Sequence, residues 1–201
     1  MTRPLVVACG ALVAELRAVL GQLASPEDVE VVYLPASLHN RPDRIVPAVE
    51  QALAGAADRP VFVAYADCGT GGALDRFLDA HPGVDRLPGA HCYEFFAGAG
   101  AFAALHDQEP GTFYLTDFLA KHFVALVWQG LGLDRHPELR DTYFANYRRV
   151  VLLSQTGGEE ILRAGRAAAA TLGLSFQYVR TGFGPFGDAV RVGLRRQENH
   201  D

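Results

Sequence analysis

The stretch that decides the fold is Val61-Phe62-Val63-Ala64-Tyr65-Ala66-Asp67-Cys68-Gly69-Thr70-Gly71-Gly72, which is followed by residues 73–80. Its first five residues are apolar and rich in β-branched and aromatic side chains, which predicts a buried strand. The glycine-rich turn then leads into a predicted helix over 73–80. A strand that runs through a tight turn into a helix is the unit from which parallel α/β sheets are built.

The same order recurs on both sides of this stretch. Strands are expected over 5–8, 29–34, 90–95, 149–153 and 175–180. Helices with apolar residues at helical spacing are expected over 11–23, 43–57 and 159–172, with Pro47 in the first turn of the second. Alternating strands and helices predict an α/β fold, with a mostly parallel sheet and helices on both faces.

The middle of the chain departs from this alternation. Residues 98–147 are expected to form a helical insertion, with helices over 99–107, 116–129 and 137–147 and Thr116 as an N-cap. No polar linker divides the chain, so we expect a single α/β domain over residues 1–194. The polar residues 195–201 are expected to form a frayed tail.

Composition narrows the class of protein. The 201 residues are 49% hydrophobic and 20% charged, which is typical of a globular protein with a real core. A net charge of −5 argues against binding to nucleic acid or to an anionic membrane, and no apolar run is long enough to span a bilayer. The N-terminal residues lack the features of a signal peptide, so we expect a cytoplasmic protein.

The residues that carry chemistry follow the predicted strands. Each of four consecutive strands ends at or near a thiol, an imidazole or a carboxylate, and these residues are Cys9, His39, Asp67, Cys68, His91, Cys92 and Glu94. In open α/β sheets, ligands bind outside the carboxyl ends of the strands. All three cysteines of the chain lie at such positions. We therefore expect them to converge on one reactive or metal-binding site.

Three cysteines cannot all pair internally, and in a reducing compartment they are free thiols, metal ligands or redox groups. Cys9, Cys68 and Cys92 suit zinc or a [4Fe–4S] cluster with one open position. A nucleophilic or redox thiol without a metal is a third possibility. His39 or His91 would add a ligand or a base, while Asp67 and Glu94 would orient ligands or move protons. Against this, each cysteine taken alone is more often a buried core residue.

The turn Gly69-Thr70-Gly71-Gly72 also offers backbone N–H groups that can cradle an anion. Arg41, beside His39, would supply a cation for the same ligand. The turn matches no nucleotide-binding fingerprint, and its glycines are equally explained by a tight change of chain direction.

Several of these segments together resemble the bacterial and archaeal family called domain of unknown function 1638. They are Ala8-Cys9-Gly10, residues 34–42, Tyr65–Gly72, Pro88–Glu94, Pro110–Asp117 and Gly132–Leu139. The resemblance covers roughly residues 5 to 190. It implies an association with corrinoid-dependent methyltransferases of one-carbon metabolism, in which zinc commonly activates a thiol.

Two functions follow as expectations. The first is a metalloenzyme, such as a metal-dependent methyltransferase, or an accessory factor to one, with a corrinoid protein or methyltransferase as partner and a small-molecule substrate. The second is a non-enzymatic protein that binds a corrinoid or another anionic cofactor through the glycine-rich turn and Arg41. In that case the cysteines would be structural.

Overall fold

The computed structural model describes residues 3–23, 25–56 and 59–198, with side chains up to residue 195. These residues group into two compact units. The first contains the chain up to Phe95 together with the part from Pro185 onward, and the second contains Phe96–Gly184. Each unit has its own parallel sheet, so the predicted parallel α/β fold is confirmed, although its strands form two sheets instead of one.

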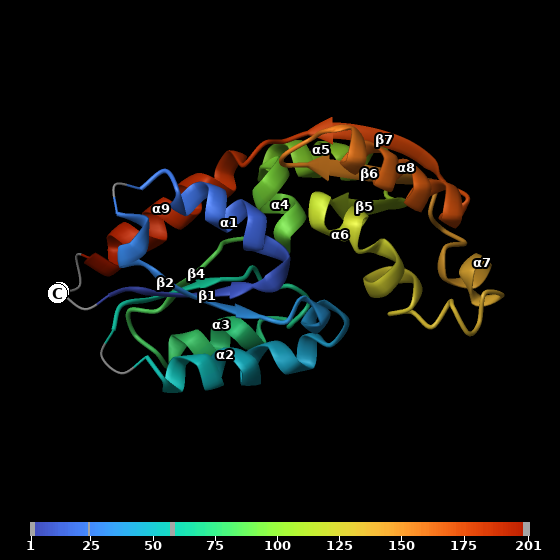
Figure 1. The fold of residues 1–201 in the computed structure, drawn as a ribbon. Helices are drawn as coiled ribbons and strands as arrows, with labels where there is room; N and C mark the ends of the chain where they lie inside the picture. Colours follow the sequence, from blue (N-terminus) through green and yellow to red (C-terminus); the bar gives the residue numbers. More distant parts are fainter. Residues whose placement is uncertain (1–2, 24, 57–58, 199–201) are drawn as a thin grey trace. The chain divides into compact units, whose positions relative to one another are not determined.

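The sheet of the first unit contains four parallel strands (Figure 1). They are β1 (Leu5–Cys9), β2 (Glu30–Leu34), β3 (Val61–Ala64) and β4 (Asp85–Arg86). Their order is β2-β1-β3-β4, and Ala8 of β1 pairs with Tyr33 on one side and Ala64 on the other. The connections that leave β1 and β3 run in opposite directions across the sheet. A topological switch point therefore lies between these two strands.

Helices cover both faces of this sheet, with α1 and α9 on one side and α2 and α3 on the other (Figure 1). Their bounds are α1 Val13–Leu20, α2 Ile45–Ala54, α3 Ala73–Asp79 and α9 Gly184–Glu198. Short 3-10 turns cover Gly10–Leu12, Pro26–Asp28, Ala36–Asn40 and Pro42–Arg44. Helix α9 lies close to the sheet at Gly193, where a Cβ would clash with the ring of Phe62.

Three expectations for this unit need correction. The strand expected over 90–95 is wrong, because α4 (Cys92–Ala97) is a helix there and the fourth strand is β4. Two adjacent buried aromatic residues, Phe95 and Phe96, suggested a strand, but the Glu94 carboxylate accepts a hydrogen bond from the Ala90 N–H at 3.0 Å at the start of a helix. The helix expected over 11–23 ends at Leu20. Helix α9 runs through Arg195 to Glu198, so this part of the expected tail is helical, while residues 199–201 lie outside the described residues.

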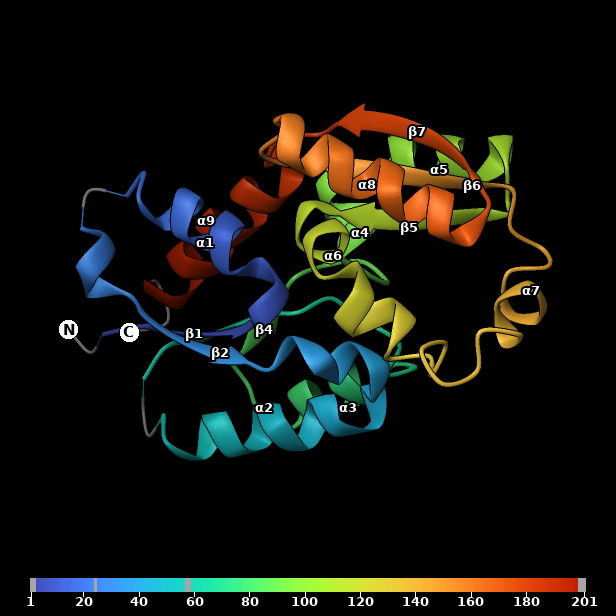
Figure 2. The same cartoon turned by 45° about the vertical axis from the view of Figure 1, so that its right-hand side comes forward.

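The second unit contains β5 (Thr112–Thr116), β6 (Arg149–Ser154) and β7 (Ser175–Arg180), in that order and all parallel. Helix α8 (Glu159–Leu172) covers one face and α5 (Ala99–Gln108) the other, as Figure 2 shows. The remaining helical elements are α6 (Asp117–Lys121), a π-helical turn over Val124–Trp128, and α7 (Leu139–Tyr143). Gly165 lets α8 approach the sheet, because a Cβ there would lie 2.8 Å from Leu152.

The segment expected to contain helices and loops therefore also contains an edge strand, β5, that the sequence analysis missed. Thr116 is confirmed as an N-cap, since its hydroxyl accepts a hydrogen bond from the Leu119 N–H at 3.2 Å. The single domain expected over residues 1–194 stays a prediction, because two groups of contacts do not show whether the units unfold together. No helix within the described ranges has the length and apolar character needed to cross a membrane.

Candidate functional site

The seven strand-end residues named from the sequence all belong to the first unit. Cys9 is the last residue of β1, and His39 lies in the 3-10 turn after β2. Asp67 and Cys68 form the turn after β3, and Cys92 is the first residue of α4. The ends of β1 and β3 flank the switch point, which is where open α/β sheets place their ligands.

Cys9 and His39 meet because two loops approach closely at Gly10. A Cβ at Gly10 would lie 2.8 Å from the backbone oxygen of Leu34, the last residue of β2. The buried Cys9 Sγ lies 3.7 Å from His39 Nδ1 and accepts a hydrogen bond from the Ala11 N–H at 3.4 Å. His39 Nδ1 also lies 3.1 Å from the Ala36 carbonyl oxygen, which assigns the ring proton to that nitrogen.

Burial keeps this pair in its neutral form. Burial raises the pKa of the Cys9 thiol more than the hydrogen bond from Ala11 and the neighbouring Tyr65 hydroxyl lower it. The imidazole of His39 has solvent access, yet the surrounding protein lowers its pKa, against the opposite effect of the hydrogen bond to Ala36. Cys9 and His39 therefore form a thiol–imidazole contact and not a thiolate–imidazolium ion pair at neutral pH.

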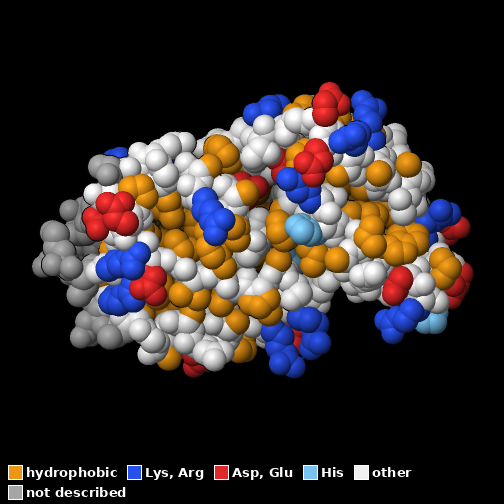
Figure 3. Space-filling model, in the orientation of Figure 1, with side chains coloured by type: hydrophobic (Ala, Val, Ile, Leu, Met, Phe, Trp, Pro, Cys, Tyr) orange, Lys and Arg blue, Asp and Glu red, His pale blue; other side chains and the backbone are white. Residues whose placement is uncertain are grey.

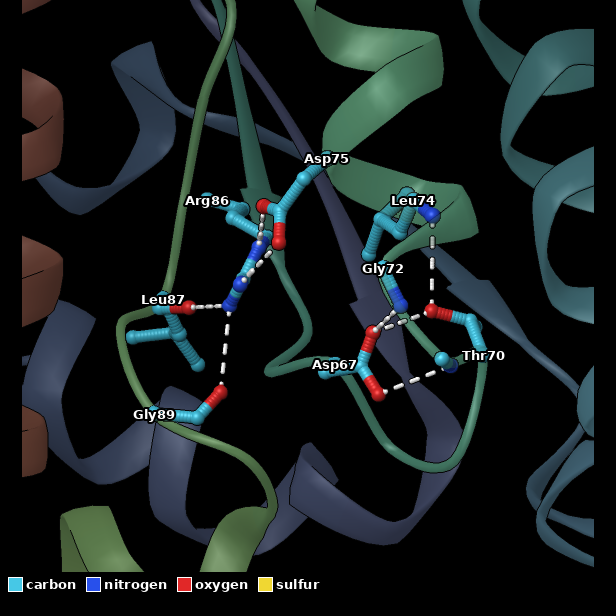
Figure 4. A network of polar contacts seen from close by, with 9 residues as sticks. Asp67, Thr70, Gly72, Leu74, Asp75, Arg86, Leu87 and Gly89 are labelled. Atoms are coloured by element: carbon cyan, nitrogen blue, oxygen red, sulfur yellow. Dashed lines mark hydrogen bonds and ion pairs between the residues drawn. The ribbon is translucent and has the colours of Figure 1, made fainter.

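The Asp67 carboxylate closes the turn that follows β3 (Figure 4). Cys68 is the next residue of this turn. The Asp67 carboxylate accepts hydrogen bonds from the N–H groups of Gly71 at 3.0 Å and Gly72 at 2.8 Å, and from the Thr70 hydroxyl. Cys68 has a φ of 51°, and it is the one non-glycine residue with positive φ among those the structure describes. Its N–H donates to the Ala90 oxygen at 2.8 Å, which anchors the backbone of the strained residue.

The backbone donors that we expected to cradle an external anion thus bind an internal one. Burial raises the pKa of Asp67, but the hydrogen bonds from Thr70, Gly72 and Gly71 outweigh it and leave the pKa below its ordinary value. Asp67 is therefore ionised at neutral pH, and its contacts shape the turn. Catalysis by Asp67 and cofactor binding by Gly69, Thr70, Gly71 and Gly72 stay predictions.

Helix α4 brings the third thiol. Cys92 opens the helix and is half-buried, and His91 precedes it, with its ring centroid 5.3 Å from that of Tyr93. The Glu94 carboxylate accepts a hydrogen bond from the Ala90 N–H at the start of the helix. Glu94 therefore has a helix-capping contact, and proton transfer by His91 or Glu94 stays a prediction.

The three thiols share one electrostatic environment. Burial, followed by the charge of Cys9, raises the pKa of Cys68 to about 12. Burial, followed by the charges of Cys68 and Cys9, raises the pKa of Cys92 well above its ordinary value. In the described part of the chain, however, no group of three or more His, Cys, Asp or Glu side chains is spaced to hold a metal ion. The thiols thus gather in one region without forming a closed ligand set.

Two buried residues near the thiols were missed by the sequence analysis. Glu15 in α1 is 2% exposed, and its charge contributes to the raised pKa of both Cys9 and Cys92. Its position between Leu12 and Leu16 on the apolar stripe of the helix was the signal that could have found it.

The second is Tyr65, which is 1% exposed. Its hydroxyl oxygen is buried and has no hydrogen-bond partner among the described residues. Burial raises the pKa of Tyr65, and the charge of Cys9 and donation to an ionised Cys9 raise it further. A buried hydroxyl without a partner is costly, and Tyr65 stands directly after β3 beside the thiol region.

Arg41 does not contact the thiols in any hydrogen bond or ion pair given by the structure. Its guanidinium forms a surface ion pair with Asp43, with Nε 3.3 Å from Oδ1, and both side chains are mostly exposed. Anion binding by Arg41 stays a prediction. On the face shown in Figure 3, acidic and basic side chains are interspersed, as is typical of a solvated protein surface.

Comparison with known proteins confirms the resemblance. A family model described as "Protein of unknown function (DUF1638)" matches residues 33–189, which include His39, Cys68 and Cys92 but not Cys9. No curated protein matches the chain, and no solved structure does. Because the family model covers most of the sequence, the chain belongs to the DUF1638 family.

Proposed function

We propose that the chain binds a thiophilic metal centre, either zinc or an iron–sulfur cluster, through Cys9, Cys68 and Cys92. The observation that carries this proposal is the placement of the three thiols around the switch point of one sheet. Cys9 ends β1, Cys68 follows the neighbouring strand β3, and the Cys68 N–H donates to the oxygen of Ala90, two residues before Cys92. Strand ends far apart in sequence deliver them to this place. Thiolates are donors that both kinds of centre use, and three of them leave one position open for a further ligand.

The electrostatics favour a metal over a free reactive thiol. Reactive cysteines have lowered pKa values, because a positive charge or a helix terminus stabilises the thiolate. Here burial and neighbouring negative charges raise the pKa of all three thiols. A bound cation reverses this effect and deprotonates its thiol ligands outright. The metal would supply Lewis acidity or an activated thiolate.

Two further groups fit such a centre. The His39 ring donates from Nδ1 to the Ala36 oxygen, which leaves Nε2 as a ligand oriented in the way that metal-binding histidines commonly are. The buried Tyr65 hydroxyl would gain a partner once Cys9 is ionised. Since the described side chains do not form a closed ligand set, binding requires the thiol-bearing side chains to shift toward a common point.

We further propose that this centre serves methyl transfer linked to a corrinoid, either as an enzyme or as an accessory factor to a methyltransferase. Family membership supports this role through the association that the resemblance implies. The cysteines are free thiols, which accords with a reducing cytoplasmic setting. The partner would be a corrinoid protein or methyltransferase, together with a small-molecule substrate.

The alternative is a non-enzymatic binding protein with structural cysteines. The absence of a closely spaced ligand group among the described residues favours it. Neutral, buried thiols also behave as small apolar side chains. Binding of an anionic cofactor at the glycine-rich turn has less support, because the N–H groups of Gly71 and Gly72 already donate to Asp67.

Anaerobic purification with metal analysis and an absorbance spectrum separates the two functions. We expect about one zinc, or about four irons with sulfide, per chain. Cys9→Ser, Cys68→Ser and Cys92→Ser should each lower the metal content, while His136→Ala, at an exposed contact with Glu138, should not. A wild-type chain without metal, together with a triple Cys→Ser variant that still binds a corrinoid as the wild type does, would establish the alternative.

A further inference from the structure

Arg86, the last residue of β4, contacts both Asp75 and the chain segment that contains Leu87 and Gly89 (Figure 4). Its side chain is 16% exposed. Nε and Nη2 donate to the two carboxylate oxygens of Asp75, near the start of α3. Nη1 donates to the backbone oxygens of Leu87 at 2.6 Å and Gly89 at 3.2 Å. One guanidinium therefore connects a helix to the chain segment that follows β4.

That segment, residues 87–90, is the backbone partner of the Cys68 turn. The Gly89 oxygen, which accepts from Arg86, also accepts from the Asp67 N–H at 3.2 Å. The next carbonyl, that of Ala90, accepts from the Cys68 N–H at 2.8 Å. Because the two hydrogen bonds are consecutive, a shift of Gly89 displaces the strained Cys68 as well.

The same segment also sets the start of the helix that carries Cys92. The Ala90 N–H donates to the Glu94 carboxylate, two residues beyond Cys92. Gly89 has a φ of 94°, and a Cβ there would lie 2.8 Å from Glu94 Oε2, so this path of the chain requires glycine. Ala90 thus contacts both thiol-bearing segments. Its oxygen accepts from the Cys68 N–H, and its N–H donates to Glu94 of the helix that carries Cys92.

The segment has little other support from the sheet. β4 is two residues long, and the hydrogen bond that continues its pairing is Leu87 N–H to the Val63 oxygen at 3.1 Å. Lysine could not replace Arg86, because its single ammonium cannot reach both carboxylate oxygens and two carbonyls in a planar fork. Asp75 is 50% exposed, so loss of the guanidinium leaves a carboxylate that water can solvate.

We propose that Arg86 is the positioning residue of the thiol site, because its guanidinium fixes residues 87–90 and thereby the mutual placement of Cys68 and Cys92. The expected effect of Arg86 on metal affinity rests on the proposed metal-binding function. Its effect on the positions of Cys68 and Cys92 can be measured without metal. Arg86 is not a ligand, and it acts through the backbone of its neighbours.

The test compares Arg86→Met and Arg86→Lys with Arg59→Met. Arg59 is a matched control in the same unit, since it also donates to a backbone oxygen, that of Arg3, and to a carboxylate, that of Glu30. For the metal-free proteins, hydrogen exchange of the Cys68 amide and native-state alkylation of Cys68 and Cys92 are measured by mass spectrometry. For Zn²⁺, affinity is measured by competition with a chromophoric chelator.

We expect faster exchange at Cys68 and faster alkylation of both thiols in Arg86→Met than in Arg59→Met. Zn²⁺ affinity should fall by about 10- to 100-fold in Arg86→Met, the usual effect of removing a group that supports metal ligands, and by less in Arg86→Lys. Asp75→Asn weakens the contact between Arg86 and Asp75 from the exposed partner, so exchange, alkylation and Zn²⁺ affinity should change in the same direction but less. This variant replaces Arg86→Met in the test if Arg86→Met does not fold.

Unchanged exchange and alkylation in both Arg86 variants and in Asp75→Asn would overturn the positioning role, even if the wild type binds zinc. Equal Zn²⁺ affinity in wild type and Arg86→Met would overturn it as well. A wild type that binds neither zinc nor iron would instead contradict the proposed function, and the exchange data would still decide whether Arg86 positions the two thiols.

Discussion

The Sγ atom of Cys9 lies 3.7 Å from Nδ1 of His39, at the ends of two neighbouring parallel strands. Burial raises the pKa of the thiol and lowers that of the imidazole, so the contact joins two neutral groups. The sulfur can ligate a cation once it is ionised, and His39 would ligate through Nε2, because Nδ1 carries the proton donated to Ala36. This contact therefore suits a binding site for a metal better than a ready nucleophile.

His39 gives a prediction for stability at mildly acidic pH. Its folded-state pKa is lowered below the ordinary value of 6.5, so the unfolded chain binds the proton more readily. The free energy of unfolding should therefore fall as the pH decreases through 6.5, and His39→Gln should remove this part of the slope. Urea unfolding of both proteins between pH 5 and pH 8 measures the difference, and parallel curves would contradict it.

The thiols give the opposite prediction at alkaline pH. Their folded-state pKa values are raised, that of Cys68 to about 12, so their contribution to stability is present below the ordinary value and lost as the pH rises toward 12. Metal-free wild type should lose stability above about pH 9 more steeply than the triple Cys→Ser variant. If chemical unfolding gives the same slope for both, the thiols are not buried as described.

Gly10→Ala tests the close approach that brings Cys9 to His39. The added Cβ meets the Leu34 backbone oxygen at 2.8 Å, which cannot rotate away, so we expect a loss of about 1–3 kcal/mol. Gly100→Ala is the control, because a Cβ there meets nothing within 4 Å in helix α5 and should be neutral or stabilise by up to about 1 kcal/mol. Thermal unfolding of the two variants should separate them in sign.

Asp67→Asn tests the carboxylate that closes the Cys68 turn. The amide loses acceptor capacity for the N–H groups of Gly71 and Gly72, and with partial solvent exposure we expect a loss of about 1 kcal/mol at pH 7. Because the pKa of Asp67 is lowered on folding, this contribution should disappear as the pH falls below the ordinary value of 3.8. Denaturant unfolding measures both effects, and Asp79→Asn, at the exposed end of α3, is the control that should change stability at pH 7 by less than about 0.5 kcal/mol.

Tyr65→Phe separates the metal-free from the metal-bound protein. The buried hydroxyl has no hydrogen-bond partner among the described residues, so its removal should leave metal-free stability within about 0.5 kcal/mol or raise it. Thr116→Val removes a hydroxyl that caps α6 and should cost about 1 kcal/mol. Zn²⁺ affinity should nevertheless fall in Tyr65→Phe, and a marked loss of metal-free stability would show that the hydroxyl already has a partner.

Local sequence determined much of the fold. The apolar runs at β1, β3 and β6 are short, rich in β-branched residues and bounded by turns, and helix α8 is amphipathic. Each was therefore located from the residues alone. The same patterns placed Cys9 and Cys68 at strand ends. By contrast, the aromatic residues of α4 and β5 suit either a strand or a helix, and the choice was made by packing and by the contact between Glu94 and Ala90.

Tertiary structure alone decided what the candidate site is. The sequence placed the three cysteines at strand ends, but their ionisation depends on burial, on each other and on Glu15, which are properties of the folded neighbourhood. Likewise, the sequence of the glycine-rich turn is compatible with binding an external anion. In the folded protein, however, the N–H groups of Gly71 and Gly72 donate to Asp67. Periodicity is a local property of the chain, whereas desolvation and hydrogen bonding depend on which distant residues share a space.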